Sequence, residues 1–385
     1  MPQKKLPAVF MRGGTSKAIV FHARDLPASR AEWEPIFLSV IGSPDPNMRQ
    51  LNGMGGGVSS LSKVCVIGPP THPDADVDYT FAQVLIDKAR VDYNSNCGNM
   101  SSAIGPFAVD EGLVAKPRNG EAVVRIHNTN TKKIIVSRFG MDGDEAAVAG
   151  DMALDGVAGT GAPIRLEFME PGGAKTGKLL PTGKAADILQ VPRVGRMPVS
   201  MIDAANPCVF VPAEAIGATA TEPPTEIEGN SQLMAKLEAI RRAASVAMGI
   251  APDIEKAGNL SVPIVAFVAP PVAMSVLSGR KLAAGDMDIA VRMMSNGQAH
   301  RATPLTGALC LAVATRIPGS IPNEMARRLA QDASQIRIGH ASGVIVVDAK
   351  IGHAKGSNEP HAEYAAVYRT ARRLFDGRVH YRGEG

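Results

Sequence analysis

The chain has 385 residues, which is long for a single hydrophobic core and favours two domains. Its composition, 45% hydrophobic and 20% charged, is ordinary for a globular protein and argues against a disordered chain. The net charge of +4 is mild, the basic residues are scattered, and no apolar stretch approaches ~20 residues, so we expect neither a nucleic-acid-binding nor a membrane-spanning protein.

Strand signals dominate the first half of the sequence. β-Branched or aromatic runs bounded by Gly, Pro, Asp or Asn predict strands at 7–13, 17–23, 62–68, 77–86, 121–129 and 132–139. Two helices are predicted between them. The first, 31–45, ends at Gly42 and Pro44, and the second, 98–114, is mostly apolar and closes at Gly112.

The second half mixes longer helices with strands. The pattern predicts helices at 231–249, with Ser231 as its cap, and at 285–297 and 304–317, and buried strands at 261–270 and 342–351. The composition changes at 179–196, which we interpret as a linker. We therefore predict an N-terminal domain at 1–185 and a C-terminal domain at 190–375, with the tail 376–385 free to return to the first domain.

A weak internal echo links the two halves. Residues 95–109 and 300–314 each place a polar or Gly-containing turn before a helix without charges. A helix that is apolar on every side is buried, so we expect an α+β protein with strands wrapped around one central helix in each domain. Helix N-termini attract anions, which favours a dicarboxylate site in the cleft between the domains.

The four cysteines and eight histidines show no familiar ligand pattern. No CxxC pair occurs, so we expect reduced thiols and a cytoplasmic protein. No spacing suits a metal, and we expect none. The segment 172–179 nearly matches the phosphate loop GxxxxGK[ST], but Leu179 replaces the hydroxyl residue and Pro181 follows, so we predict a turn there.

Cys97 differs in its surroundings from Cys65, Cys208 and Cys310, which lie in apolar runs and are interpreted as buried residues. It is preceded by Asn96 and followed by Gly98, at the start of a predicted apolar helix. The helix dipole and free backbone amides stabilise a thiolate at such a position. Cys97 therefore suits a nucleophile or a proton carrier, although a small buried residue is the plainer alternative.

Lys63 lies within a segment, Asn52–Gly68, whose glycines and serines could cradle an anion through their backbone amides. Val58 stands where the dinucleotide pattern GxGxxG requires Gly, so that ligand is not predicted. Lys63 opens an apolar strand, where partial desolvation would make a lysine a base. A solvated lysine at a strand end fits the local sequence equally well.

Motifs spread along nearly the whole chain together resemble the PrpF family. They are MRGGTSKAIVF (11–21), GSPDP (42–46), SSLSKV (59–64), DVDYTFAQV (76–84), NCGN (96–99), TGKLLPTG (176–183), DAANPCVFV (203–211) and IRIGHASG (336–343). That family includes 2-methylaconitate isomerases, 4-oxalomesaconate tautomerases and 3-methylitaconate isomerases. It shares the two-domain diaminopimelate epimerase fold, in which each domain wraps strands around a central helix.

The resemblance implies a cofactor-independent isomerase that shifts a proton between two carbons of an unsaturated di- or tricarboxylate, such as 2-methylaconitate or 4-oxalomesaconate. The reaction would move a double bond or exchange cis and trans forms. The implied partner is this small anion, with neither nucleic acid nor membrane, and a homodimer is left open.

By the same resemblance, Lys63 is the principal base and Cys97 its acid partner. Ser16 and Lys17 are implied to bind substrate carboxylate, with Arg12 structural, and Ala18 departs from the Gly that is common in the family. The other implied substrate-binding residues are Gly55, Gly56, Ser59, Ser60, Asn99, Met100, Asn206, His300, Arg301, Thr306, Gly307, Ser342 and Gly343.

Two alternatives to this isomerase are considered. An amino-acid epimerase or racemase of the same fold uses one thiol at the start of each central helix, but here the second start reads TPLTGA, with Pro304 or a neighbour in the place of a thiol. A non-catalytic carboxylate-binding relative needs neither Lys63 nor Cys97. Both alternatives are therefore less well supported than the isomerase.

Overall fold

The computed structural model describes residues 3–93, 96–117, 120–295, 297–327, 335–354, 356–357 and 359–382. The chain forms two compact units. Unit 1 consists of Met1–Glu167 and Tyr368–Gly385, and unit 2 of Phe168–Val367. The sequence had suggested a boundary at 185–190 and a returning tail at 376–385, of which 383–385 lie outside the described residues, as do Asn94 and Ser95 beside the NCGN motif.

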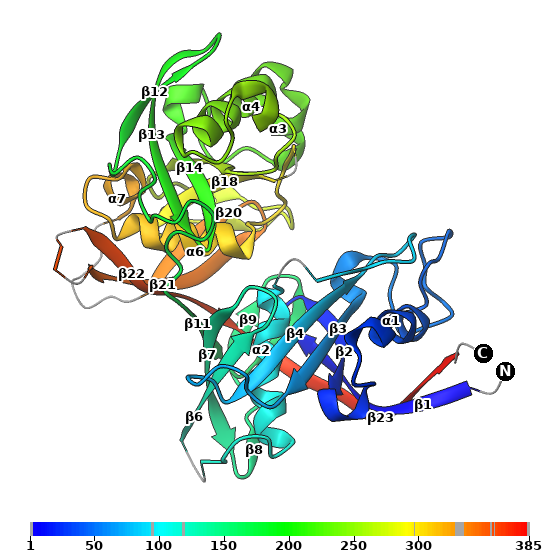
Figure 1. Ribbon diagram of the computed structural model, residues 1–385. Helices are drawn as coiled ribbons and strands as arrows, with labels where there is room; N and C mark the ends of the chain where they lie inside the picture. The colour runs from blue at the N-terminus through cyan, green and yellow to red at the C-terminus, as the bar shows by residue number, and fades with distance from the viewer. Residues whose placement is uncertain are drawn as a thin grey trace. The chain divides into compact units, whose positions relative to one another are not determined.

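Unit 1 is built on one mixed sheet with the strand order β23-β1-β2-β3-β4-β6-β7 (Figure 1). Its strands are β1 (Gln3–Gly13), β2 (Ser16–His22), β3 (Lys63–Gly68), β4 (Val77–Val84), β5 (Val91–Asp92), β6 (Glu121–Asn128), β7 (Lys133–Asp142), β8 (Glu145–Ala146), β9 (Met152–Leu154), β10 (Val157–Gly161) and β23 (Ala371–Arg382). Its helices are α1 (Trp33–Ile41) and α2 (Gly98–Asp110), with 3-10 turns η1 (Ala23–Asp25), η2 (Arg30–Glu32) and η3 (Ser59–Leu61).

The two faces of this sheet pack against different helices. Successive side chains of a strand point to opposite faces. Val64 and Val66 of β3 join the core beneath α1, together with Phe37 of that helix. Lys63 and Cys65, which alternate with these two valines along β3, therefore lie on the other face, against which α2 packs.

Unit 2 is built on a second sheet with the strand order β12-β13-β14-β15-β18-β20-β21-β22. Its strands are β12 (Asp187–Val191), β13 (Gly195–Ala204), β14 (Asn206–Pro212), β15 (Ile264–Ala269), β16 (Met274–Ser275), β17 (Lys281–Leu282), β18 (Ile289–Ser295), β19 (Gln298–Ala299), β20 (Gln335–His340) and β21 (Gly343–His353). Its helices are α3 (Pro224–Gly229), α4 (Ser231–Ala247), α5 (Ile254–Ala257), α6 (Leu305–Thr315) and α7 (Ile321–Met325), with η4 (Glu214–Ile216) and η5 (Ala284–Asp286). The chain passes between the units within β11 (Ile164–Met169) and β22 (Pro360–Arg369).

The two sheets repeat one topology. In unit 1 the strands β1-β2-β3-β4-β6-β7 pair in the sequence antiparallel, parallel, antiparallel, parallel, antiparallel. In unit 2 the strands β13-β14-β15-β18-β20-β21 pair in the same sequence. The central helix, α2 or α6, precedes the fifth strand of each set. The weak similarity between the two apolar segments therefore reflects a repeated fold.

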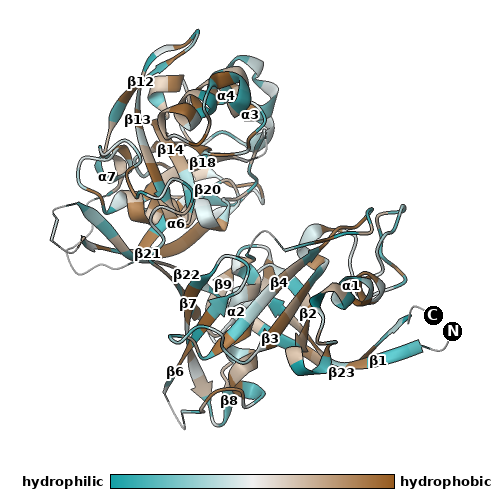
Figure 2. Ribbon diagram, in the orientation of Figure 1, coloured by the Kyte–Doolittle hydropathy of each residue, from teal (hydrophilic) through white to brown (hydrophobic). Residues whose placement is uncertain are grey.

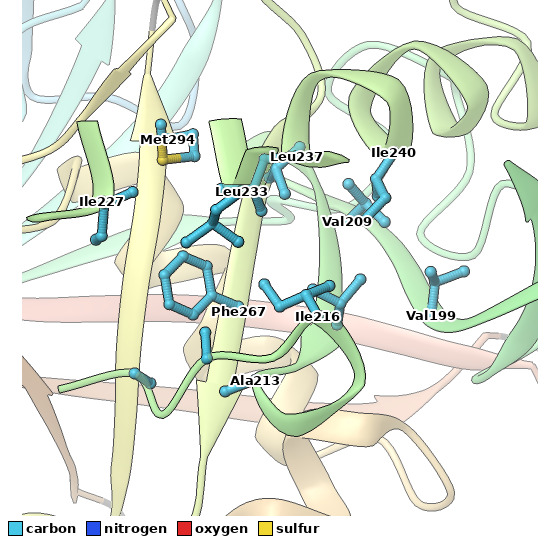
Figure 3. Packing of buried hydrophobic residues seen from close by; sticks show 14 of the residues in the cluster. Val199, Val209, Ala213, Ile216, Ile227, Leu233, Leu237, Ile240, Phe267 and Met294 are labelled. Atoms are coloured by element: carbon cyan, nitrogen blue, oxygen red, sulfur yellow. The ribbon is translucent and has the colours of Figure 1, made fainter. Parts of the chain in front are cut away.

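Both central helices are buried, as predicted. Every residue of α2 from Met100 to Val109 and every residue of α6 from Gly307 to Thr315 is buried. Figure 2 shows the hydrophobic colour of α6. On the opposite face of the unit 2 sheet, Leu233, Leu237 and Ile240 of α4 pack on a core that includes Phe267 of β15 (Figure 3). The α+β class predicted from the sequence is confirmed.

Most predicted elements are confirmed, with three corrections. The segment 285–297, predicted as a helix, forms strand β18, because a short run buried on both faces lacks a period that separates strand from helix. The segment 179–196 is not a linker but carries β12, which pairs with β13 inside unit 2. Asn230 rather than Ser231 caps α4, through its side chain and the Leu233 amide.

Other predicted features are observed as expected. Gly42 ends α1 in the left-handed region with φ 86°. The segment 172–179 is a turn in which the Asp203 carboxylate accepts hydrogen bonds from the Lys175 and Thr176 amides. Among the described residues, no helix is long and apolar enough to cross a membrane.

The core beneath α1 should set the stability of unit 1. Phe37 is fully buried there, whereas Leu51 is 75% exposed. We predict that Phe37→Ala lowers the free energy of unfolding by about 3–5 kcal/mol, because it removes apolar contact and leaves a cavity. Leu51→Ala should change it by less than about 0.5 kcal/mol. Urea denaturation followed by circular dichroism would measure both, and equal effects would contradict the assignment of this core.

Candidate active site

Cys97 is the N-cap of α2. Its backbone is extended, and its Sγ accepts a hydrogen bond from the Met100 amide at 3.5 Å. The amides of Gly98 and Asn99 find no acceptor among the described residues. Cys97 is half-buried, whereas the other three cysteines are buried. The helix start therefore presents a reachable thiol beside unpaired N–H groups, which suits an anion.

Lys63 opens β3 on the face of the sheet that packs against α2. Its side chain is not the solvated strand end that the local sequence also allowed, because the residue is only 7% exposed. Nζ donates a hydrogen bond to Gln83 Oε1 at 2.5 Å and lies 5.0 Å from the centre of the Phe81 ring. Within the described chain no carboxylate pairs with Lys63.

Gln83, which the sequence analysis missed, orients this lysine. It is the direct partner of Lys63 across β3 and β4. Its Nε2 donates to the carbonyl oxygens of Ser59 and Ser62, at 3.1 and 2.9 Å, so its Oε1 is left to face Lys63. A usable signal was present, since Gln83 is the polar residue on an otherwise apolar strand face that includes Tyr79 and Phe81.

The loop before β3 is closed by Gln50, a second residue that was missed. Gln50 is 1% exposed, and its Oε1 accepts from Ser62 Oγ at 2.7 Å and from the Gly57 amide at 2.9 Å. A Cβ at Gly55 would overlap this Gln50 oxygen, and one at Gly56 would lie 2.6 Å from Leu61. Both glycines thus serve the packing of the loop.

The GSPDP motif fixes the other end of this loop. The Asp45 carboxylate accepts hydrogen bonds from the backbone amides of Asn47, Arg49 and Gln50. These bonds lower the pKa of Asp45, with the Asn47 amide contributing most. Ser59 and Ser60 follow in η3, which ends two residues before Lys63; Ser59 is exposed and Ser60 is half-buried.

The turn between β1 and β2 packs against the first turn of α2. Gly14 has φ 52°, and a Cβ there would overlap the Asn99 side chain. Asn99 Nδ2 donates to Thr15 Oγ1 at 3.1 Å. Ser16 is buried and pairs with Gly13 at this turn. The structure thus brings Ser16, Asn99 and the buried Met100 to the same helix start as Cys97.

Lys17 is not brought to that group. It alternates with Ser16 along β2 and points to the face away from α2, where its Nζ lies 5.7 Å from the centre of the Phe10 ring. Arg12 is its cross-strand partner. Arg12 Nη1 donates to the carbonyl oxygens of Gly14 and Thr370 and to Thr370 Oγ1, at 2.9–3.0 Å, a structural clamp on the turn.

Arg369 is a third residue that the sequence analysis missed. Its Nε donates to Asn99 Oδ1 at 3.1 Å, and its Nη1 donates to the Tyr368 carbonyl at 2.9 Å. Burial lowers the pKa of Arg369 to about 10, against the attraction of a Cys97 thiolate, which raises it. The guanidinium therefore remains charged at neutral pH. Its distance of 270 residues from Asn99 in the sequence left no local signal.

The unit 2 candidates gather around the start of α6 within their own unit. Asn206 Nδ2 donates to Thr306 Oγ1 at 3.5 Å, and a Cβ at Gly307 would lie 2.7 Å from Met293 Sδ. Ser342 Oγ donates to the carbonyl oxygen of Arg301, and Gly343 follows as the first residue of β21.

Two charged candidates of unit 2 differ in their availability. The Arg301 guanidinium makes two hydrogen bonds to the Glu228 carboxylate, at 2.8 and 3.0 Å, which raise the pKa of Arg301. Its charge is thus already paired. Burial lowers the pKa of His300, whose Nδ1 accepts from the Ala302 amide, so this ring is mainly neutral at pH 7.

The repeated topology identifies the positions in unit 2 that correspond to Lys63 and Cys97. Lys63 forms the first pair of the parallel strands β2 and β3, and Ile264 holds that place in β14 and β15. Cys97 caps α2, and Pro304 caps α6. Of the two repeats, only unit 1 carries an amine and a thiol at these positions.

These motifs and this fold match one family along almost the whole chain. The PrpF protein family matches residues 3–382. The chain belongs to the PrpF family. A 3-methylitaconate isomerase of Eubacterium barkeri is 42% identical over 98% of this chain and 97% of its own length. A 2-methyl-aconitate isomerase of Cupriavidus necator is 39% identical over 100% and 99%.

A solved structure agrees with the fold as well. The crystal structure of a methylitaconate-delta-isomerase superposes with a TM-score of 0.92 and 41% identity, over 99% of this chain and 96% of that one. A (4E)-oxalomesaconate Delta-isomerase of Novosphingobium sp. (strain KA1) is 39% identical over 97% of this chain and 96% of its own. In the described part of this family member, no group of three or more His, Cys, Asp or Glu side chains could hold a metal ion.

The Gly14 turn offers a test of how tightly this site is built. Gly14→Ala should add a steric overlap with Asn99 to the cost of a left-handed alanine, roughly 1–2 kcal/mol. Gly143→Ala is the matched control, because Gly143 has φ 60° and nothing lies within 4 Å of its added Cβ. We predict a further loss of about 1–3 kcal/mol for Gly14→Ala over Gly143→Ala in urea denaturation. Equal losses in the two variants would show that the Asn99 side chain can move aside without lowering the free energy of unfolding.

Proposed function

We propose that this protein is an isomerase that moves a carbon–carbon double bond in an unsaturated di- or tricarboxylate. Lys63 is the base and Cys97 the acid, and no cofactor takes part. The observation that carries the proposal is the environment of Lys63, a buried amine whose hydrogen-bond partner is a neutral amide, on the sheet face against which α2, capped by Cys97, packs. Relatives about 40% identical along their whole length are named as isomerases of such acids.

The reaction needs a base that is neutral before it acts. Gln83 gives Lys63 an acceptor without a charge. Lys63 then takes a proton from an sp³ carbon next to the double bond. The electron pair of that C–H bond delocalises through the double bond into a substrate carboxylate, which gains negative charge.

The second proton transfer completes the shift. Cys97 gives its thiol proton to the far carbon of the allylic system, and the double bond settles between the other two carbons. The Lys63 ammonium and the Cys97 thiolate return to their starting states by proton exchange with solvent. The unpaired amides at the start of α2 stabilise the negative charge while it is delocalised.

The epimerase alternative is disfavoured by the second unit. Inversion at one carbon calls for an acid or base on each side of that carbon, and the unit 2 positions are held by Ile264 and Pro304. Asn206, Thr306 and Gly307 instead offer hydrogen bonds and close packing, which suit carboxylate binding. The role of the unit 2 residues as substrate contacts stays a prediction.

A panel of acids tests the substrate class. We expect turnover of at least one of 2-methylaconitate, 4-oxalomesaconate and 3-methylitaconate, followed by ultraviolet absorbance and proton NMR, and none of proline, alanine or diaminopimelate. Racemisation of an amino acid, without isomerisation of any unsaturated acid, would replace this proposal with the epimerase.

The division of labour is tested on the active substrate. Lys63→Ala should abolish both isomerisation and uptake of solvent deuterium into substrate, whereas Lys88→Ala, at an exposed lysine, should keep wild-type rates. Cys97→Ser should reduce turnover by ~100-fold or more if the thiol is an obligatory acid. Cys310→Ala serves as its control and should keep near wild-type turnover, because that thiol is fully buried in the middle of α6.

The outcomes separate the two residues. Deuterium uptake without net isomerisation in Cys97→Ser would show that the first proton transfer survives alone. A small loss in Cys97→Ser, with Lys63→Ala inactive, would reduce Cys97 to orienting the substrate. Near-full activity of Lys63→Ala would remove Lys63 from the mechanism.

A further inference from the structure

Arg369 is a nearly buried guanidinium without an acidic partner. It is 7% exposed, and the carbonyl and amide oxygens of Tyr368 and Asn99 are its hydrogen-bond acceptors. Within the described residues, no Asp or Glu pairs with it. A buried charge is costly unless it is paired, so an anion placed beside Arg369 would be stabilised.

The free part of this guanidinium is not sealed in the protein. Nε and Nη1 are used by Asn99 and Tyr368, and Nη2 makes no hydrogen bond to a described residue. Because Nη2 is unpaired but is not among the fully buried unpaired atoms, it is still reachable by solvent. The outer edge of Arg369 can therefore still bind a ligand.

The sheet faces single out Arg369 among the nearby cations. Arg12 and Lys17 are cross-strand partners on the face away from α2. Lys63 lies on the α2 face but must be neutral to act as a base. Arg369 bonds directly to Asn99 in the first turn of α2, two residues after Cys97.

We propose, resting on the isomerase function above, that Arg369 binds one carboxylate of the substrate through Nη2 while its Nε fixes the Asn99 amide. The substrate carries two or three negative charges, and a fixed guanidinium supplies charge-assisted hydrogen bonds to a carboxylate. The same group then stabilises the carboxylate that gains charge when Lys63 removes the proton. Asn99, held through Oδ1, keeps its Nδ2 on Thr15 and so keeps the turn at Gly14 in place.

Binding can be measured apart from turnover with propane-1,2,3-tricarboxylate, a saturated acid that cannot isomerise. Its affinity is read by isothermal titration calorimetry and by protection of Cys97 from iodoacetamide, since the other three thiols are buried. We expect Arg369→Gln to weaken this binding roughly 10- to 100-fold, the scale of a lost hydrogen bond to a charged group. Arg369→Lys keeps the positive charge but loses the planar group of N–H donors, so its affinity should lie between those of the wild type and Arg369→Gln.

The matched control is Arg378→Gln, an exposed arginine of β23 that should bind like the wild type. Circular dichroism and urea denaturation show whether each variant is folded. On the active substrate, Arg369→Gln should raise KM by a similar factor to its loss of affinity for the saturated acid.

The outcomes distinguish this inference from the proposed reaction. A folded Arg369→Gln that binds the saturated acid as tightly as the wild type, with only kcat reduced, would overturn the carboxylate contact and leave the isomerase standing. In a different outcome, the wild type binds the saturated acid and Arg369→Gln does not, but the wild type isomerises no acid of the panel. This result would support the contact and overturn the reaction. No binding of the saturated acid by the wild type, together with an unchanged KM for the active substrate in Arg369→Gln, would overturn the contact and leave the reaction to be decided by the panel.

Discussion

The hydrogen bond between Lys63 and Gln83 is the constraint on which the rest of the site depends. An amine buried on a sheet face needs a hydrogen-bond acceptor, and the neutral amide of Gln83 supplies one. Gln83 can do this because its own amide group is held by the carbonyl oxygens of Ser59 and Ser62. The same loop is held by Gln50, whose Oε1 accepts hydrogen bonds from the Ser62 hydroxyl and the Gly57 amide.

The repeated topology allows the two units to be compared position by position. Both units offer the start of a buried helix next to a parallel strand pair, and the same backbone serves an amine and a thiol in unit 1 but an isoleucine and a proline in unit 2. A helix N-terminus needs no particular side chain to attract an anion. The start of α6 carries Asn206 and Thr306 in place of an amine and a thiol.

The sequence was informative wherever a local pattern decides the outcome. Apolar runs predicted α2 and α6, Gly42 predicted the end of α1, and the polar neighbours of Cys97 predicted its place at a helix start. The prediction for β18 was wrong because a strand buried on both faces shows no alternation of apolar and polar residues. Lys17 was expected beside Ser16 at the start of α2, but it points to the other face of the sheet. A sequence motif shows which residues are adjacent in the chain, not which face of the strand each one occupies. Gln50 and Arg369 act across 12 and 270 residues, distances at which no local pattern operates.

The passage of the chain through unit 2 has a consequence for synthesis on the ribosome. Unit 1 is discontinuous, because its last strand and Arg369 follow the whole of unit 2. When Lys63 and Cys97 leave the ribosome, β1 still lacks its edge partner β23, and the turn at Gly14 lacks Thr370. Unit 2 has all of its residues before unit 1 does. The nascent protein thus carries Lys63 and Cys97 long before Arg369, and a chain that ends early has the half-buried thiol without the guanidinium that bonds Asn99 beside it.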